Sequence, residues 1–364
     1  MTVIDRYIVR TFVVGYLILV GVGVGMYVLI DLLINLDDFL EDRTLTGLQV
    51  LGLMFDFYGH NLPLYYAQLG GPMMAVAAAF TLGRMLKNNE LTALVAAGMP
   101  LQRLVVPLLL SSFGLTALWM ANRECVMPAF AAQIARRHED ASGARPLGVY
   151  CARDEHRAIL TALQVFPREG LLRRVFIFEP PVEGKPTHLL EADEARWDAA
   201  RRTWRLERGR RILMGEATDG PGVGQAIRYE PVDEYAFGLG PEELALRRGS
   251  QWADLLSLRQ LNQLMRSHSL PNLATIDMAR HIRLTHPLLQ WLLLLLAVPF
   301  FLTCQPANVL AAGGRALLLT GSFYLILFVA HSAVQEGTKA AIIAWIPLLI
   351  FGPIAAVQLS NIRT

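Results

Sequence analysis

The chain has 364 residues, of which 54% are hydrophobic and only 18% are charged, whereas soluble domains are about 25% charged. The formal net charge is +2, and the basic residues do not cluster with aromatic ones, so a nucleic-acid-binding protein is not expected. The charge is unevenly spread: 24 of the 33 Lys and Arg residues and 22 of the 31 Asp and Glu residues lie between Arg123 and Arg283. This distribution predicts a membrane protein that carries one soluble insert.

Six apolar runs come close to the roughly 20 residues that a helix needs to cross a bilayer. In chain order they are Thr11–Ile30, Gly59–Gly83, Leu104–Asn122, Pro287–Thr303, Ala316–Gln335 and Ala340–Ile362. The first run has full bilayer length and no small-residue cleavage site closes it, so we expect it to be retained rather than removed as a signal peptide. The sequence therefore predicts three spans before the insert and three after it.

The basic residues in the short flanks set the expected orientation, because Lys and Arg accumulate on the cytoplasmic side. With a cytoplasmic N-terminus, seven basic residues lie in inner flanks and two in outer loops. The inner residues are Arg6, Arg10, Arg84, Lys87, Arg103, Arg315 and Arg363, and the outer ones are Arg43 and Lys339. We expect both termini in the cytoplasm and the insert outside.

A short polar stretch, RMLKNNELTALVAAGMP, separates the second and third runs and would face the cytoplasm. It carries the signals of a short helix at 88–98. These signals are Asn88 and Asn89 as N-cap candidates, Glu90 in the first turn, Leu91, Leu94 and Val95 on one side, and Gly98 and Pro100 at the end. The stretch therefore predicts one short amphipathic helix between two spans.

The insert, 126–281, has a different pattern of short β-like runs. They are RAILTALQVF, LLRRVFIFEP, RTWRLERGRRILM and QAIRYEPVDEYAF, with turn residues between them. Their spacing suggests a sandwich or an open jellyroll-like sheet, in which Trp197 and Trp204 are core or edge-packing residues. The final segment, LSLRQLNQLMRS, reads as an amphipathic helix that returns the chain to the membrane.

Motifs for catalysis or metal binding are missing from the sequence. It contains no G-x-x-x-x-G-K-[ST], HExxH or GxSxG pattern, and Cys125, Cys151 and Cys304 lack metal-site spacing. Cys125 and Cys151 could pair in an oxidising compartment. His60 and His331 lie in or near spans, where they are either functional or hydrogen-bonded to a neighbouring helix. We expect no catalytic residue, metal or cofactor in this chain, and any energy would come from a partner.

Four segments in the right order, which together cover essentially the whole chain, resemble the LptF/LptG (YjgP/YjgQ) permease family of the lipopolysaccharide transport machine. They are the opening TVIDRYIVRTFVVGYLILVGVGVGMYVLIDLLINLDDF, the cytoplasmic LGRMLKNNELTALVAAGMPLQRLVVPLL, EADEARWDAARRTWRL, and RHIRLTHPLLQWLLLLLAVPF. The acidic ending of the first segment leans towards the LptG branch.

The resemblance implies six transmembrane helices with an inserted all-β jellyroll-like periplasmic domain, in a protein of the bacterial inner membrane. It implies a second LptF/LptG-type permease, a cytoplasmic ABC ATPase dimer that binds ATP and Mg, a jellyroll-type bridge protein, and lipopolysaccharide or a related glycolipid as cargo. The helix at 88–98 resembles the coupling helix that docks into the ATPase. Its coupling residues would be Glu90, Leu91, Leu94, Gly98 and Arg103.

One part of the sequence departs from the family. Basic residues near the outer end of the first span are expected to meet the acidic lipid head, but this edge reads DLLINLDDFLEDR. The cargo could carry less phosphate, divalent cations could bridge, or the second permease could supply positive charge; otherwise the edge is a solvated acidic loop. The cargo-cavity candidates are Asp31, Asp37, Asp38, Arg43, His331 and Gln335.

The expected organisation is thus 1–125 for the first three spans, 126–281 for the periplasmic domain and 282–364 for the last three spans. Two other functions remain open on this sequence: an ABC permease for a lipoprotein or peptide, and a membrane-anchored sensor or scaffold. A scaffold would not need a cytoplasmic helix between spans or polar residues within them, and this chain has both.

Overall fold

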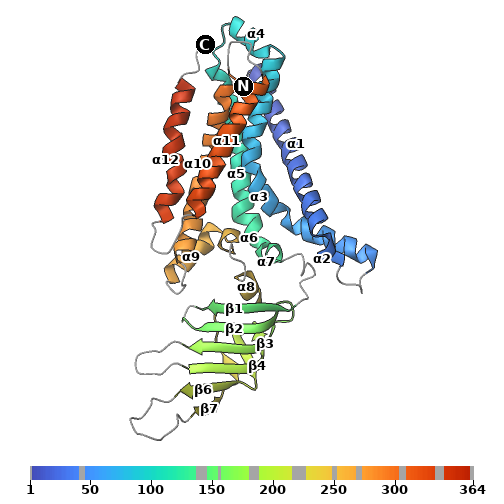
Figure 1. Cartoon of the computed structure of the whole chain (residues 1–364), viewed down its shortest axis with the longest axis vertical. Coiled ribbons are helices and arrows are strands. Elements are labelled where there is room, and N and C mark those ends of the chain that lie inside the picture. The colour runs from blue at the N-terminus through green and yellow to red at the C-terminus, as the bar shows by residue number, and fades with distance from the viewer. Residues whose placement is uncertain are drawn as a thin grey trace. The chain divides into compact units, whose positions relative to one another are not determined.

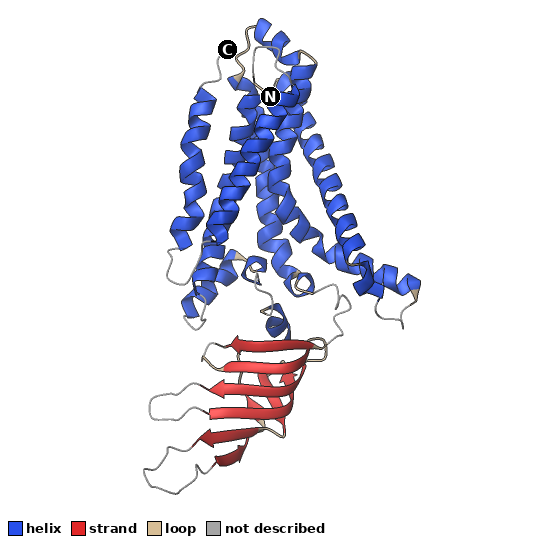
Figure 2. Ribbon diagram, in the orientation of Figure 1, coloured by secondary structure: helices blue, strands red, loops and turns tan. Residues whose placement is uncertain are grey.

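A computed structural model describes residues 2–40, 46–136, 146–154, 157–179, 188–214, 227–247, 252–267, 273–302, 309–332 and 340–360. The chain divides into two compact units (Figures 1 and 2). The helical unit comprises Met1–Ile34, Asn61–Pro128 and Ala274–Thr364, and the second unit comprises Asn35–His60 and Ala129–Leu273. The sequence predicts an insert at 126–281. The second unit covers 129–273 of this range and also includes 35–60.

Long apolar helices build the helical unit. They are α1 (Val3–Ile34), α3 (Gly47–Lys87, whose first residues belong to the second unit), α5 (Gln102–Ala121), α10 (Leu273–Ala297), α11 (Val309–Ser332) and α12 (Ala340–Ser360). Within the described residues, five stretches are long and apolar enough to cross a membrane, and α11 carries a shorter apolar stretch at Gly314–Val329. The protein therefore has at least five candidate spans, and the sixth stays a prediction.

The fourth span differs from its predicted bounds of 287–303. The helix α10 begins at Leu273 and ends at Ala297, followed by a short 3-10 turn, η4 (Val298–Phe300). Charged residues had set the predicted start, but the helix tolerates them because they have partners: Arg280 lies 3.0 Å from Asp277 one turn earlier. Counting charges along a sequence cannot show such pairing, which lowers their cost near a membrane.

The core of the helical unit lies where the first half of α1 packs on α3 and α5. Ile8, Phe12 and Tyr16 of α1 are buried in one apolar cluster with residues of the other two helices. At Gly70, an added Cβ would lie 3.0 Å from Trp119 and 3.1 Å from the Tyr16 hydroxyl oxygen, so glycine permits this close approach. Beyond Tyr16, no residue of α1 from 17 to 34 is buried. The buried contacts of α1 are therefore concentrated in its first half, while the second half makes more exposed contacts such as that of Tyr27 with Tyr65.

Both ends of the described chain lie at the same end of the helical unit. Figure 1 shows the start of α1, the finish of α12 and the short helix α4 (Glu90–Ala96) at this end. This arrangement agrees with an even number of crossings between the first and last long helices.

The second unit contains an antiparallel sheet. Its strands are β1 (Leu147–Arg153), β2 (Ile159–Phe166), β3 (Leu171–Glu179), β4 (His188–Asp198), β5 (Thr203–Glu207), β6 (Arg210–Met214), β7 (Ile227–Pro231) and β8 (Glu234–Tyr235). The main order is β1-β2-β3-β4-β5-β8, while β6 pairs with β4 and β7. On one side, the long strand β4 pairs with two strands. Its first residues pair with β6 and its last residues pair with β5. An antiparallel sheet domain is present, and the jellyroll form stays a prediction.

Several predicted strands are confirmed and two runs divide. RAILTALQVF and LLRRVFIFEP contain β2 and β3, but RTWRLERGRRILM forms both β5 and β6, and QAIRYEPVDEYAF forms β7 and β8. The first division occurs at Gly209, where an added Cβ would overlap the carbonyl oxygen of Val232. The Gly209 carbonyl accepts a hydrogen bond from the Val232 N–H at 3.0 Å. Glycine therefore lets the chain break one strand and approach another segment closely.

The sheet buries one face in its own apolar core. Trp204 is 1% exposed and donates its indole N–H to the Leu239 carbonyl at 3.1 Å. Trp197 lies directly opposite it on β4, with ring centroids 5.1 Å apart. This confirms the prediction that both tryptophans pack in or beside the core. Short helices complete the unit: α2 (Leu36–Leu40), α7 (Ala131–Ile134), α8 (Pro241–Leu246), η3 (Trp252–Leu255) and the predicted amphipathic helix, α9 (Leu258–Ser267).

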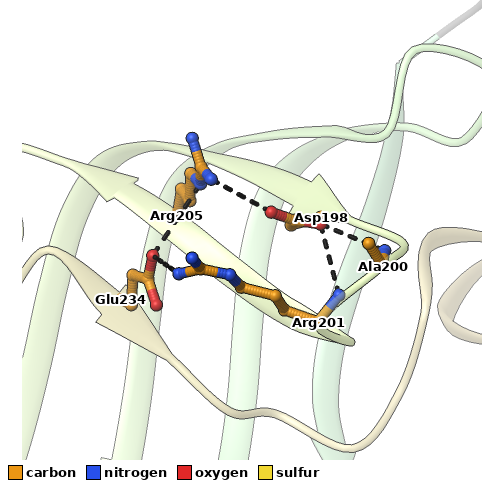
Figure 3. Close-up of polar contacts among 5 residues, drawn as sticks. All are labelled: Asp198, Ala200, Arg201, Arg205 and Glu234. Atoms are coloured by element: carbon orange, nitrogen blue, oxygen red, sulfur yellow. Dashed lines mark hydrogen bonds and ion pairs between the residues drawn. The ribbon is translucent and has the colours of Figure 1, made fainter.

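The turn between β4 and β5 is held by Asp198 (Figure 3). Its carboxylate accepts the backbone N–H groups of Ala200 at 3.0 Å and Arg201 at 3.3 Å, and the Arg205 guanidinium at 3.1 Å. The Arg201 N–H bond, aided by that of Ala200 and by the charge of Arg205, lowers the pKa of the Asp198 carboxyl. Glu234 of β8 pairs with both arginines, so the charges also link three strands.

Candidate functional site

The predicted short helix is present as α4, seven residues from Glu90 to Ala96. Its end is built by Gly98, which has a φ of 81°. The Gly98 N–H donates to the Val95 carbonyl at 2.9 Å and the Met99 N–H donates to the Leu94 carbonyl at 3.0 Å. These two bonds form the Schellman arrangement, which favours glycine at the left-handed position. The predicted helix stop at Gly98 is thereby confirmed.

Asn89, one of the two predicted N-cap candidates, occupies the N-cap position of α4 but does not cap the helix with its side chain. Asn89 has a left-handed φ of 56° and its side chain makes no cap hydrogen bond. The preceding helix α3 continues to Lys87, so only two residues are left to reverse the chain. Asparagine adopts the left-handed conformation more readily than most residues. Asn88 instead donates its side-chain amide to the Glu90 carboxylate at 3.1 Å.

One side of α4 is fixed to its own chain. Leu91 is 1% exposed and belongs to the core cluster of the helical unit, and Leu94 and Val95 pack against that cluster. The Tyr7 hydroxyl of α1 lies 3.1 and 3.3 Å from the two Glu90 carboxylate oxygens. Leu91 and Leu94 therefore make contacts within the chain, and a coupling role for them stays a prediction.

The opposite side of α4 is exposed and carries small side chains. Its exposed residues are Thr92, Ala93, Ala96 and Ala97, followed by Gly98. Arg103, near the start of α5, is exposed as well. A surface of small side chains allows another backbone to approach closely, and Arg103 adds a positive charge at the end of the same segment.

A second candidate region lies where α5 continues into a π-helical turn, η1 (Asn122–Val126), and then α6 (Met127–Ala129). The Met127 N–H donates to the Asn122 carbonyl. The residue that would serve the Arg123 carbonyl in this i to i+5 pattern is Pro128, which has no N–H. Pro128 therefore cannot continue the i to i+5 pattern at the Arg123 carbonyl, which can instead accept from a side-chain donor.

That donor is Arg283 of α10, whose side chain is 1% exposed. Its Nη1 donates to the Arg123 carbonyl at 3.1 Å and lies 2.6 Å from a Glu124 carboxylate oxygen. One buried cation therefore joins α10 to the π-helical turn through a backbone carbonyl and a carboxylate. A charged group in this position is stable only with such partners.

Arg123 and His286 join the same group of polar contacts. The Arg123 guanidinium is 3.2 Å from His286 Nδ1 and 5.3 Å from the Trp119 ring centroid. Because arginine can only donate, His286 Nδ1 accepts and the ring carries its proton on Nε2. The Trp119 ring also lies 5.0 Å from the His286 ring. Arg123, Glu124, Arg283, His286 and Trp119 will be called the outer polar cluster, after the expected outward orientation of this end of the helices.

The outer polar cluster was not found from the sequence. Arg123 and Arg283 were used only as the limits of the charge-rich region, although both fall inside candidate spans. A usable signal was present: Arg283, His286 and Gln290 recur at helical spacing on an otherwise apolar helix. Gln290 is 3% exposed and packs on Gly71 of α3, where an added Cβ would lie 3.0 Å from its amide nitrogen.

Only some of the candidate residues at the acidic edge lie within the described part of the chain. Asp31 is near the end of α1, Asp37 and Asp38 begin α2, and Arg43 lies outside the described residues. Across the described residues, no three or more His, Cys, Asp or Glu side chains gather as a group that could hold a metal ion. A divalent cation bridging this edge to cargo therefore stays a prediction.

The remaining candidate residues provide less evidence for a functional site. His331 is in α11, but its side chain is not among those described, and Gln335 lies outside the described residues. His60 bonds within its own helix, with Nδ1 2.7 Å from the Asp56 carbonyl oxygen, instead of to a neighbouring helix. Cys125 and Cys151 are free thiols in this structure, so the alternative of a disulfide between them finds no support.

In a comparison with protein families, the model of the lipopolysaccharide export system permease LptF/LptG matches residues 6–361. Comparison with curated proteins gives no match. The long apolar helices and the separate antiparallel sheet define a multi-pass membrane protein with one inserted β domain. The chain belongs to the LptF/LptG family, and is thus a transport component of the inner membrane rather than an enzyme. The match does not distinguish LptF from LptG.

Proposed function

We propose that this chain extracts lipopolysaccharide, or a related glycolipid, from the inner membrane and passes it to a periplasmic bridge. A second permease of the same family completes the membrane cavity, and a cytoplasmic ABC ATPase dimer binds ATP and Mg and supplies the energy. Both termini lie in the cytoplasm and the sheet domain in the periplasm. The family match over nearly the whole chain supports this proposal, as do the basic flanks of the expected spans.

The observation that carries the mechanical part is the two-sided character of α4. Leu91 anchors its inner side in the core of the helical unit, while Thr92, Ala93 and Ala96 are exposed on the outer side. A docked ATPase would contact the outer side and move α4 as part of its own chain. Glu90 and Arg103 would offer one charge of each sign to the partner surface.

The arrangement of α1 supports an opening for lipid. Its first half is buried against α3 and α5, whereas residues 17–34 have no buried side chain. The exposed apolar residues on this half include Leu17, Val22, Met26 and Leu29. We propose that this half borders the cavity shared with the second permease, and that the cargo enters beside it. Asp31 would lie at the outer end of this route.

The test compares substitutions on the two sides of α4. Ala93→Asp places a charge on the exposed side, and we expect it to abolish co-purification of the ATPase and lipid-stimulated ATP hydrolysis, with normal membrane insertion. Ala93→Ser, which stays small and neutral, is the matched control and should retain both. If Ala93→Asp captures and stimulates the ATPase as the parent does, the exposed side of α4 is not the docking surface.

A further inference from the structure

The contact between Tyr7 and Glu90 joins two segments that are 83 residues apart in the sequence. The Tyr7 hydroxyl approaches both carboxylate oxygens, at 3.1 and 3.3 Å, and the Asn88 amide approaches one of them at 3.1 Å. A carboxylate that accepts two donors has a restricted orientation, and hydrogen bonds to a charged acceptor are stronger than neutral ones. The direction of the Glu90 side chain is thus set by α1 as well as by α4.

The next residue on each helix adds an apolar contact region. Ile8 follows Tyr7 and is 0% exposed, and Leu91 follows Glu90 and is 1% exposed; both belong to the same core cluster. The first turn of α4 is therefore tied to the first turns of α1 by a polar contact at the surface and by shared packing beneath it. The polar contact is directional, whereas the packing alone would allow α4 to slide.

The helix α1 is suited to carry a displacement away from this point. It runs for 32 residues from Val3 to Ile34, contains no proline, and has its buried residues only in its first half. A continuous helix of this length spans about 48 Å at 1.5 Å per residue. A small shift of its buried end would be passed to residues 17–34, none of which is buried, although Tyr27 still packs against Tyr65 of α3.

We propose that Tyr7 is a positioning residue for Glu90, and that the bond between them passes the movement of α4 to α1. This inference rests on the proposed function, in which an ATPase moves α4. Tyr7 does not contact the ATPase or the lipid in this account. Its hydroxyl fixes the carboxylate that the ATPase meets and makes α1 move when α4 moves.

The first test needs no partner protein. In the full chain in lipid nanodiscs, Tyr7→Phe should speed amide hydrogen exchange of residues 90–96 by about 3- to 10-fold, the range that one lost hydrogen bond can produce. The matched control is Tyr229→Phe on β7, which removes a hydroxyl from an exposed tyrosine of the sheet and should leave that exchange unchanged. Equal exchange in Tyr7→Phe and the parent would overturn the inference.

The second test measures lipid released per ATP hydrolysed, in vesicles that contain the chain, a second permease and the ATPase. Tyr7→Phe should lower this ratio severalfold. Combining it with Glu90→Ala should lower the ratio no further than Glu90→Ala alone, because both changes remove one interaction. An unchanged ratio, or additive losses, would overturn the positioning role. If the parent captures no ATPase, the proposed function fails, while the exchange result still decides whether Tyr7 fixes α4.

Discussion

The guanidinium of Arg283 lies 2.6 Å from the carboxylate of Glu124, and the arginine side chain is 1% exposed while the glutamate is 23% exposed. The same nitrogen donates to the Arg123 carbonyl, to which Pro128, five residues on in the π-helical turn, can offer no N–H. One side chain thus compensates both a buried charge and a backbone irregularity next to Pro128. The stability of the junction between α5 and α10 should depend on this pair more than on any exposed ion pair.

Arg283→Met should therefore destabilise the chain by about 3–5 kcal/mol, because it removes a buried cation that serves both the Glu124 carboxylate and the Arg123 carbonyl. The matched control is Arg196→Met, which breaks an exposed pair whose side chains are 66% and 60% accessible; such pairs contribute about 0–1 kcal/mol. Thermal unfolding of the purified chain in detergent measures both. Similar losses for the two variants would show that Arg283 does not hold this junction.

Gly209→Ala should destabilise the sheet by about 1–3 kcal/mol, the usual cost of overpacking, since the new methyl group would overlap the Val232 carbonyl oxygen. Gly238→Ala is the control because its added Cβ would meet no atom within 4 Å. Limited proteolysis in rising urea, followed by cleavage within 129–273, reports on this unit alone. The expectation fails if both variants resist cleavage to the same urea concentration as the parent.

Asp198 should make the stability of the chain depend on pH in the acidic range. Its carboxyl has a lowered pKa in the folded protein, chiefly through the Arg201 backbone N–H. The resulting stabilisation is present above the unfolded value of about 3.9 and is lost as the pH falls through the folded value. Between pH 7 and pH 3, the melting temperature of the parent should fall further than that of Asp198→Asn. Equal falls would contradict the role of this carboxylate.

The orientation can be tested by thiol labelling after Cys125, Cys151 and Cys304 are replaced. Leu163→Cys lies on β2, where the leucine is 41% exposed, and should react with a membrane-impermeant reagent in intact spheroplasts. Asn89→Cys, next to α4, should react only after permeabilisation. The reverse pattern would place α4 in the periplasm and contradict docking to a cytoplasmic ATPase.

Periodicity and composition were enough to predict the long helices, the position of α4 and the β character of the insert, because each depends on neighbours close in sequence. Gly98 is an example: its place after an apolar stripe predicts a helix stop, and a φ of 81° confirms it. The split of RTWRLERGRRILM into two strands depends on Val232, more than 20 residues away, and no local pattern contains that information.

The candidate site was predicted less completely for the same reason. The stripe containing Leu91 was recognised, but whether it faces a partner or its own chain depends on how α1, α3 and α5 pack. The outer polar cluster depends on contacts between residues about 160 positions apart, such as Arg123 and His286. Arg123 and Arg283 mark the limits of the charge-rich region in the sequence, yet both lie inside helices. Each has a partner, His286 or Glu124, that the sequence alone does not reveal.

The measurement that tests the central claim most directly is ATP-driven lipid release from vesicles that hold this chain, a second permease of the family and the cytoplasmic ATPase. A purified jellyroll protein outside the vesicles serves as acceptor, and mass spectrometry identifies what it carries. We predict transfer of lipopolysaccharide or a related glycolipid that requires ATP and is lost in Ala93→Asp. Transfer of a lipoprotein or peptide instead, or no ATP-dependent transfer with all components present, would contradict the proposal.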